Sequence, residues 1–90
     1  METRWDPIKA DSNWRKHGIR FSNAETVLFD PHALTKEDRA CEDEQRFISL
    51  GMDLLGRLLV VVYTYEGNTI RFISARRSTR RERTSYETGI

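Results

Sequence analysis

The chain has 90 residues, 38% of them hydrophobic and 32% charged, and its 15 Lys and Arg against 14 Asp and Glu leave a net charge of +1. This length fits one domain over residues 1–90 with a modest core, and a near-neutral total by itself argues against a strong polyanion binder. The single Cys41 excludes an internal disulfide, and the absence of a signal segment or a ~20-residue apolar run predicts a cytoplasmic protein with no membrane partner.

The first predicted element is a helix over Pro7–His17. Asp6 is a good N-cap, and a proline at the first helical position gives up a backbone N–H that would have no partner there anyway. Gly18 then supplies the left-handed residue with which many helices end.

A second, shorter helix is predicted over Asn23–Phe29. Ser22 and Glu25 match a capping box, in which the two side chains satisfy each other's free backbone donors. Asp30-Pro31 should end the helix, because a residue before proline avoids the helical region.

The middle of the chain predicts strands, at His32–Thr35, Phe47–Met52, Leu58–Tyr65 and Thr69–Ala75. The β-branched and aromatic run Leu58–Tyr65 is typical of a central strand, and Gly67-Asn68 of a hairpin turn. The polar segment Lys36–Glu44 reads as an exposed loop, and residues 53–56 as a turn. Strict alternation would put Ile70, Phe72 and Ser74 on one face of the last strand and Arg71, Ile73 and Ala75 on the other.

Thr79 and Glu82 form a second capping-box match and open a last helix that runs to about Glu87. The order is then two helices, three or four antiparallel strands and a C-terminal helix. Segregated helices and hairpin-linked strands indicate an α+β fold.

The charge is distributed unevenly. Residues 1–35 carry five basic and five acidic side chains, residues 36–66 four and seven, and residues 67–90 six and two. The basic end holds six arginines, namely Arg71, Arg76, Arg77, Arg80, Arg81 and Arg83. Arginine binds phosphate through paired hydrogen bonds and stacks on unpaired bases, so this segment favours a nucleic-acid partner; a solvated basic face that docks an acidic partner is the alternative.

RNA cleavage through the 2′-hydroxyl needs a proton acceptor, a proton donor and positive charge on the phosphate. His17 and Tyr86 could move protons, although a histidine at a helix end and a tyrosine on a helix face are more often packing residues. The acidic residues at 37–44 read as a solvated loop, so no metal site is expected. No zinc-protease, phosphate-loop or serine-hydrolase motif occurs.

Several blocks of the sequence resemble the BrnT family of toxins. They are Trp5-Asp6-Pro7 with Lys9-Ala10, Asn13, Lys16-His17-Gly18 and Phe21; Glu44, Arg46 and Phe47; residues 56–64 and 70–77; and Thr79–Arg83 followed by Tyr86-Glu87. These blocks stand in register over about residues 5–88, which makes the resemblance far more specific than any one motif.

The resemblance implies a RelE-like fold and a ribonuclease of a type II toxin–antitoxin pair that works without a metal or other cofactor. It implies a BrnA-type antitoxin with a ribbon-helix-helix domain as partner, RNA as substrate, and operator DNA bound only through the antitoxin complex.

Carried onto this sequence, the resemblance and the chemistry together suggest two groups of site residues. Catalysis is expected from His17, Arg71, Arg76, Arg80 and Tyr86, and RNA binding from Lys16, Arg46, Arg77 and Arg83, with Glu44 a weaker candidate. A non-catalytic module that binds nucleic acid or the antitoxin through the same arginines is the alternative.

Overall fold

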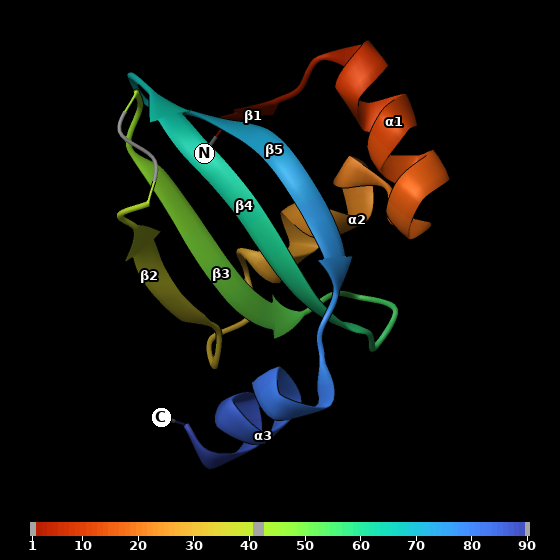
Figure 1. Ribbon diagram of the computed structural model, residues 1–90, viewed down its shortest axis with the longest axis vertical. Helices are drawn as coiled ribbons and strands as arrows, with labels where there is room; N and C mark the ends of the chain where they lie inside the picture. Colours follow the sequence, from red (N-terminus) through yellow and green to blue (C-terminus); the bar gives the residue numbers. More distant parts are fainter. Residues whose placement is uncertain (1, 41–42, 90) are drawn as a thin grey trace.

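The computed structural model describes residues 2–40 and 43–89, so Cys41 lies outside the described residues. In these residues the elements run in the order β1 (Glu2–Arg4), α1 (Pro7–His17), α2 (Phe21–Val27), β2 (Leu34–Asp38), β3 (Arg46–Met52), β4 (Leu58–Glu66), β5 (Thr69–Arg77) and α3 (Arg80–Thr88). The strands form one sheet in the order β1-β5-β4-β3-β2, shown face-on in Figure 1. The α+β class is confirmed.

The predicted strands do pair antiparallel, but the prediction of three or four strands is wrong in number and missed the strand that makes the sheet mixed. The described sheet has five strands, and β1 pairs with β5 in parallel, from Glu2 opposite Thr69 to Arg4 opposite Arg71. A polar strand of three residues is too short to show an alternation of polar and apolar side chains in the sequence. It forms because the edge of β5 is free to pair with it. The expected edge strand His32–Thr35 is displaced to Leu34–Asp38, and charged residues suit this position because they discourage pairing with another chain.

Helix α1 begins and ends where the sequence predicts. The Asp6 carboxylate accepts a 2.9 Å hydrogen bond from the backbone N–H of Ile8. Gly18 takes the left-handed conformation with φ of 70°, and its N–H donates to the Trp14 carbonyl at 2.8 Å. Both signals are local, which is why the sequence alone locates this helix.

Helix α2 begins at Phe21, two residues before its predicted start, and the expected Ser22–Glu25 capping box does not form. Arg20 is the N-cap, without a side-chain hydrogen bond. Phe21 is only 1% exposed, and its ring lies 6.1 Å from that of Trp5. Burying Phe21 requires it on the inward stripe with Ala24, so core packing overrides the capping signal.

Strand β5 does not alternate strictly. Tyr63 of β4 pairs with Phe72 while Val62 pairs with Ser74, so Ile73 is left without an opposite residue. This bulge moves Ala75 onto the core face, where it is fully buried, and corrects the expectation that Ala75 shares a face with Arg71.

The buried Asn13 of α1 holds this part of β5. Its Nδ2 donates to the carbonyls of Ile19 and Ala75, each at 2.9 Å, and its Oδ1 accepts from the Ala75 N–H at 3.0 Å. Two hydrogen bonds therefore tie α1 to the strand beside the bulge, and the third holds the segment that follows α1.

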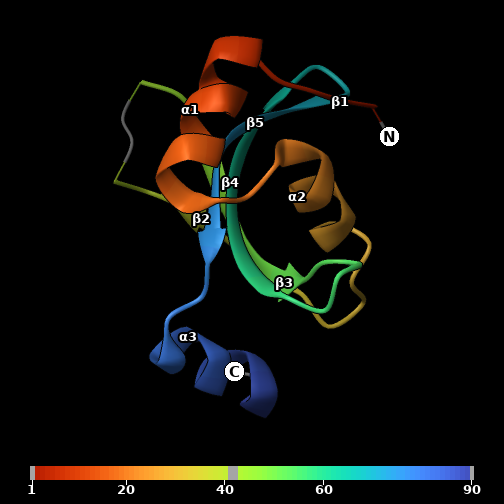
Figure 2. The ribbon, with the colours of Figure 1, turned by 90° about the vertical axis from the view of Figure 1, so that its right-hand side faces the viewer.

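The two faces of the sheet differ in their cover. Helices α1 and α2 pack on one face over the main core, and Figure 2 shows α2 on one side of the sheet seen edge-on. At Gly51 of β3 a Cβ would lie 2.9 Å from Val27 Cγ1, so a glycine is needed for α2 to approach this closely. The opposite face meets α3 at one end, where Tyr86 packs on Leu50, Leu58 and Val60. No helix in the described ranges is long and apolar enough to cross a membrane.

Candidate functional site

The face of the sheet turned away from α2 carries most of the charged side chains of β2 to β5, the exceptions being Glu37 and Arg77, which pair with Phe47 and Leu59 of the core face. Residues paired across a sheet share a face, and Val61, Tyr63 and Phe72 point into the core. The other face, named here the uncovered face, therefore presents three rows of side chains. They are Leu34, Leu50, Val60 and Arg76; then Lys36, Ile48, Val62 and Ser74; then Asp38, Arg46, Thr64 and Arg71.

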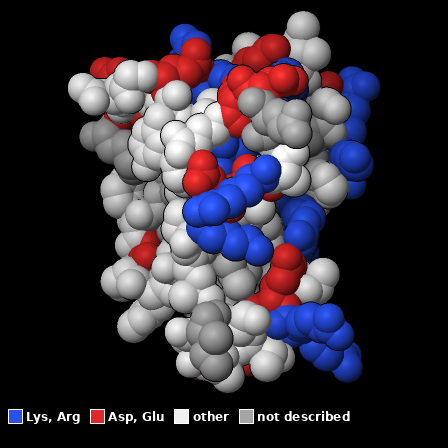
Figure 3. All heavy atoms as spheres, turned by 60° about the vertical axis from the view of Figure 1, so that its left-hand side comes forward, with Lys and Arg blue, Asp and Glu red and all other residues white. Residues whose placement is uncertain are grey.

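A groove of about 510 Å³ lies on the uncovered face beside α3. Its lining consists of Ala33, Leu34, Thr35, Lys36, Ile48, Leu50, Val60, Glu82 and Ser85. The floor is apolar, and Lys36 makes no ion pair with any described carboxylate. Figure 3, viewed from the β2 side, shows basic and acidic side chains mixed over this region rather than a uniformly positive surface.

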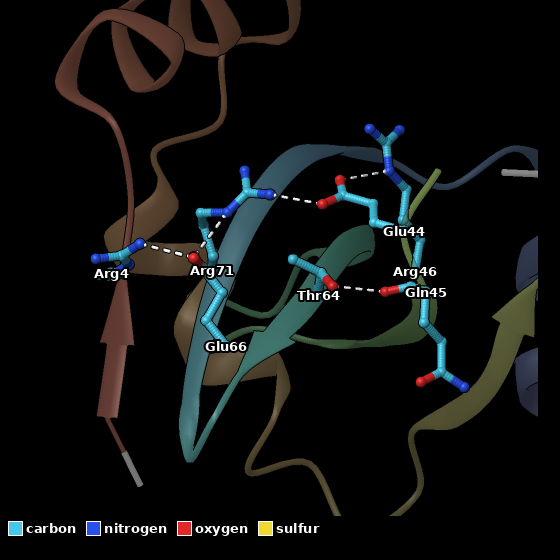
Figure 4. Close-up of polar contacts among 7 residues, drawn as sticks. All are labelled: Arg4, Glu44, Gln45, Arg46, Thr64, Glu66 and Arg71. Atoms are coloured by element: carbon cyan, nitrogen blue, oxygen red, sulfur yellow. Dashed lines mark hydrogen bonds and ion pairs between the residues drawn. The ribbon is translucent and has the colours of Figure 1, made fainter. Parts of the chain in front are cut away.

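Beyond the residues that line the groove, Arg46 and Arg71 of the third row form a cluster of ion pairs centred on Glu44 (Figure 4). One oxygen of Glu44 accepts from Arg46 Nε at 3.1 Å and the other from Arg71 Nη2 at 2.9 Å. The Arg71 Nε also lies 2.9 Å from Glu66, whose carboxylate accepts two hydrogen bonds from Arg4. The hydrogen bond from Arg4 is the main cause of the lowered pKa of Glu66.

Local contacts fix the position of Glu44, two residues before β3 begins. The Thr64 hydroxyl on β4 donates to the carbonyl of Gln45, which fixes the segment that enters β3. Glu44 is half-buried between its two arginines, and Arg71 is 23% exposed at its side chain. The carboxylate and both guanidinium groups are thus held in place but accessible to a ligand.

Arg76 and Glu82 join the end of β5 to α3. Two parallel hydrogen bonds of 2.9 Å link the guanidinium to the carboxylate. Glu82 also completes the predicted capping box with Thr79, which is confirmed. The hydrogen bonds from Arg76 are the main cause that lowers the pKa of Glu82 to about 2, and the pKa of Arg76 is raised by the same pairing.

Tyr86 points from α3 to Asp30, behind the groove. Its hydroxyl donates to Asp30 Oδ2 at 2.6 Å, and the same oxygen accepts from the Met52 N–H at 2.8 Å. Burial opposes the ionisation of Asp30, but these donors outweigh it and lower its pKa. The hydrogen bond to Asp30 raises the pKa of Tyr86 to about 12, so the phenol keeps its proton at neutral pH.

A second hollow, named here the arginine cleft, lies at the start of α3 and has a volume of about 280 Å³. It is lined by Gly56, Arg57, Leu58, Arg77, Ser78, Thr79, Arg80 and Arg83. Arg57 is bound by the buried carboxylate of Asp53 at 2.9 Å. Arg77, Arg80 and Arg83 are exposed, and none has a carboxylate of the described residues within ion-pair distance.

The sequence-predicted site residues therefore do not converge on one site. Arg46, Arg71 and Arg76 share the uncovered face, while Arg77, Arg80 and Arg83 line the arginine cleft. Lys16 and His17 line a third hollow of about 200 Å³ between α1 and β5. Sequence reasoning missed Lys36, although its place opposite Ile48 follows from alternation once β2 is extended. No group of three or more potential metal ligands occurs in residues 2–40 and 43–89.

Comparison with known proteins was made against family models, curated proteins and solved structures. A family model described as "Ribonuclease toxin, BrnT, of type II toxin-antitoxin system" matches residues 5–82. The crystal structure of the Brucella abortus ribonuclease toxin BrnT matches with a TM-score of 0.67 at 23% identity, over 89% of this chain and 99% of that one. No curated protein matches the chain. The structural likeness supports the fold described above.

Proposed function

Because the chain belongs to the BrnT family of ribonuclease toxins of type II toxin–antitoxin systems, we propose that it is a metal-independent endoribonuclease that cleaves RNA in the cytoplasm and arrests growth. We further propose that a BrnA-type ribbon-helix-helix antitoxin neutralises it, and that operator DNA is reached only through their complex. The observation that carries the proposal is the carboxylate of Glu44 held between Arg46 and Arg71 on the uncovered face.

RNA is proposed to lie across this face, from the Glu44 cluster toward the groove under α3. The floor around Ile48 and Val62 would lie under the strand, whose unpaired bases would stack on the guanidinium groups beside this floor. Lys36 and Arg76 flank this floor and would hold the phosphates on either side. A strand bound in this way would present one phosphate to Arg46 and Arg71.

Glu44 is proposed as the group that accepts the proton of the attacking 2′-hydroxyl. The 2′-oxygen bonds to phosphorus while the P–O5′ bond breaks, and the leaving 5′-oxygen takes a proton from water. In the free protein both of its oxygens accept hydrogen bonds from arginines. A phosphate that binds Arg46 and Arg71 would take over these donors and leave the carboxylate beside the reacting group. The same two guanidinium groups would stabilise the additional negative charge of the transition state.

The other predicted catalytic residues have different places in this proposal. Arg76, fixed by Glu82, is a phosphate contact at the far end of the groove. Tyr86 holds α3 in place through Asp30 and is not a proton donor to RNA. His17 and Arg80 lie in hollows other than the groove, and the proposal gives them no part in cleavage.

The proposal is tested with the purified protein and a single-stranded RNA in the presence of a chelator. Cleavage that survives the chelator and is lost in Arg71→Ala supports it, as does growth arrest on induction that the same substitution relieves. RNA that binds but stays intact would favour the alternative, a non-catalytic module. A small adjacent gene for a ribbon-helix-helix protein, and relief of the arrest by its co-expression, would identify the antitoxin.

A further inference from the structure

Two exposed leucines on the turn between β3 and β4 directly precede Gly56, a residue that lines the arginine cleft. Leu54 and Leu55 are 84% and 67% exposed. The buried carboxylate of Asp53 fixes their turn, since its Oδ1 accepts from the N–H groups of Leu55 at 3.0 Å and Arg57 at 2.8 Å. The turn is also bound to α2, because the Leu54 N–H donates to Thr26 Oγ1 at 3.0 Å. These apolar side chains are therefore held in solvent by a rigid turn.

The same turn forms one wall of the arginine cleft through Gly56 and Arg57. Across the cleft, Arg77, Arg80 and Arg83 are exposed and have no described acidic partner, in contrast to Arg46, Arg71 and Arg76 on the uncovered face. The two exposed leucines thus stand directly before Gly56, at the wall of a cleft whose three exposed arginines have no described acidic partner. We name this surface, formed by the arginine cleft with Leu54 and Leu55, the arginine–leucine surface.

The chemistry of this surface distinguishes between two kinds of anionic partner. A nucleic acid would use the arginines but gains little from aliphatic side chains, because bases bind single-strand sites by stacking on aromatic or guanidinium groups. A protein segment with carboxylates and apolar side chains would use both halves, since arginine is enriched among the residues that dominate interface energy and burial of apolar surface favours association.

We infer that the arginine–leucine surface docks an acidic protein segment that also carries apolar side chains, contributed by the antitoxin. The identity of the partner as an antitoxin rests on the proposed function. The surface is distinct from the proposed RNA site, because Arg80 and Arg83 line the cleft whereas Glu82 and Ser85 line the groove. Helix α3 therefore separates the two sites, and a segment docked on one of its sides could reach over the groove on the other.

The test measures binding of a labelled helix-forming peptide with glutamates on one face and leucines on the other, and of single-stranded poly(U) RNA. The full-length chain is compared with Arg80→Glu/Arg83→Glu and with Leu54→Ser/Leu55→Ser. Each double variant should weaken peptide binding at least about tenfold, while Leu54→Ser/Leu55→Ser leaves poly(U) binding unchanged. Arg15→Glu/Arg39→Glu changes two other exposed arginines by the same charge and should bind the peptide like wild type.

The docking proposal is overturned if the peptide does not bind. It is also overturned if Arg15→Glu/Arg39→Glu weakens peptide binding as much as Arg80→Glu/Arg83→Glu does. It is also overturned if charge reversal in the cleft removes poly(U) binding and the leucine variant changes nothing, because the surface would then be an RNA site. Cleavage assays on the same proteins separate the two proposals. A chain that binds the peptide as described but leaves RNA intact contradicts the proposed function alone.

Discussion

The hydroxyl of Tyr86 on α3 donates a 2.6 Å hydrogen bond to Oδ2 of Asp30, a residue 56 positions earlier in the chain. Asp30 also accepts from the backbone N–H groups of His32 and Met52, at 2.9 and 2.8 Å. One carboxylate thus connects the end of α2, the start of β2 and the last helix. It sets the position of α3, which forms one wall of the groove.

Replacing Tyr86 with phenylalanine should lower the free energy of unfolding by about 1–2 kcal/mol at pH 7, because a hydrogen bond to a charged acceptor is lost. The pKa of Tyr86 is raised from 10.0 to about 12 in the folded chain. The contribution of its protonated form is therefore complete below pH 10 and disappears as the pH rises toward 12. Urea unfolding from pH 7 to 12 measures this.

Tyr65→Phe is the matched control, since the Tyr65 ring is 52% exposed and should change stability little. RNA cleavage by Tyr86→Phe should keep the shape of its pH profile. A profile that loses one limb would contradict the positioning role and make Tyr86 a proton-transfer group.

Glu82→Gln should destabilise the fold by about 1–2 kcal/mol at pH 7, a value reduced for the 30% and 41% exposure of the paired side chains. Glutamine can still cap α3, so the loss reports the ion pair with Arg76. The pKa of Glu82 is lowered from 4.5 to about 2, hence its stabilisation is present above pH 4.5 and is lost as the pH falls toward 2. The melting temperatures of wild type and Glu82→Gln, measured at pH 7, 4 and 2.5, should approach each other as the pH falls. The control Glu87→Gln, on the same helix, should melt like wild type at each pH.

Glu44→Gln should reduce the rate of RNA cleavage at least about 100-fold, the usual contribution of a general base. The amide keeps the shape of the side chain but loses the charge that pairs with Arg46 and Arg71, so the free energy of unfolding should fall by about 1 kcal/mol while RNA affinity does not fall. Single-turnover cleavage of a labelled RNA measures the rate, with Glu37→Gln as a control for the loss of one nearby charge. Undiminished cleavage by Glu44→Gln would remove this residue from the mechanism.

Asn13→Leu should destabilise the chain by about 2–4 kcal/mol, because it leaves the N–H and carbonyl of Ala75 and the carbonyl of Ile19 buried without partners. Asn23→Leu is the control, since the Asn23 side chain makes no hydrogen bond with any described residue. A similar fall of the urea midpoint in both proteins would show that a general effect of replacing asparagine by leucine, and not the lost bonds to Ala75 and Ile19, causes the destabilisation.

Features defined by neighbouring residues could be predicted from the sequence. Asp6 and Gly18 set the limits of α1, and Thr79 with Glu82 sets the start of α3. Features that depend on residues far apart in the chain could not be predicted from the sequence. The start of α2 is fixed by burial of Phe21, β1 by the free edge of β5, and the face of Ala75 by a bulge.

The candidate site shows the same division. The sequence places Arg71, Arg76 and Arg80 in one basic segment and predicts one site, but the direction of each side chain depends on the strand and helix that carry it. Arg71 and Arg76 end on the uncovered face, and Arg80 faces the other side of α3. The contact between Arg71 and Glu44 spans 27 positions, and only the pairing of β3, β4 and β5 brings the two together.

The parallel pairing of β1 with β5 also bears on when the protein becomes active during its synthesis. Residues 2–4 are made well before their partners at 69–71, and such non-local pairings form late. Arg71 belongs to the same later segment, so Glu44 gains this partner only after residue 71 has been made. A product of interrupted translation that ends before Arg71 therefore lacks both the sheet edge and the charge cluster, and we expect such fragments to be harmless to the cell that makes them.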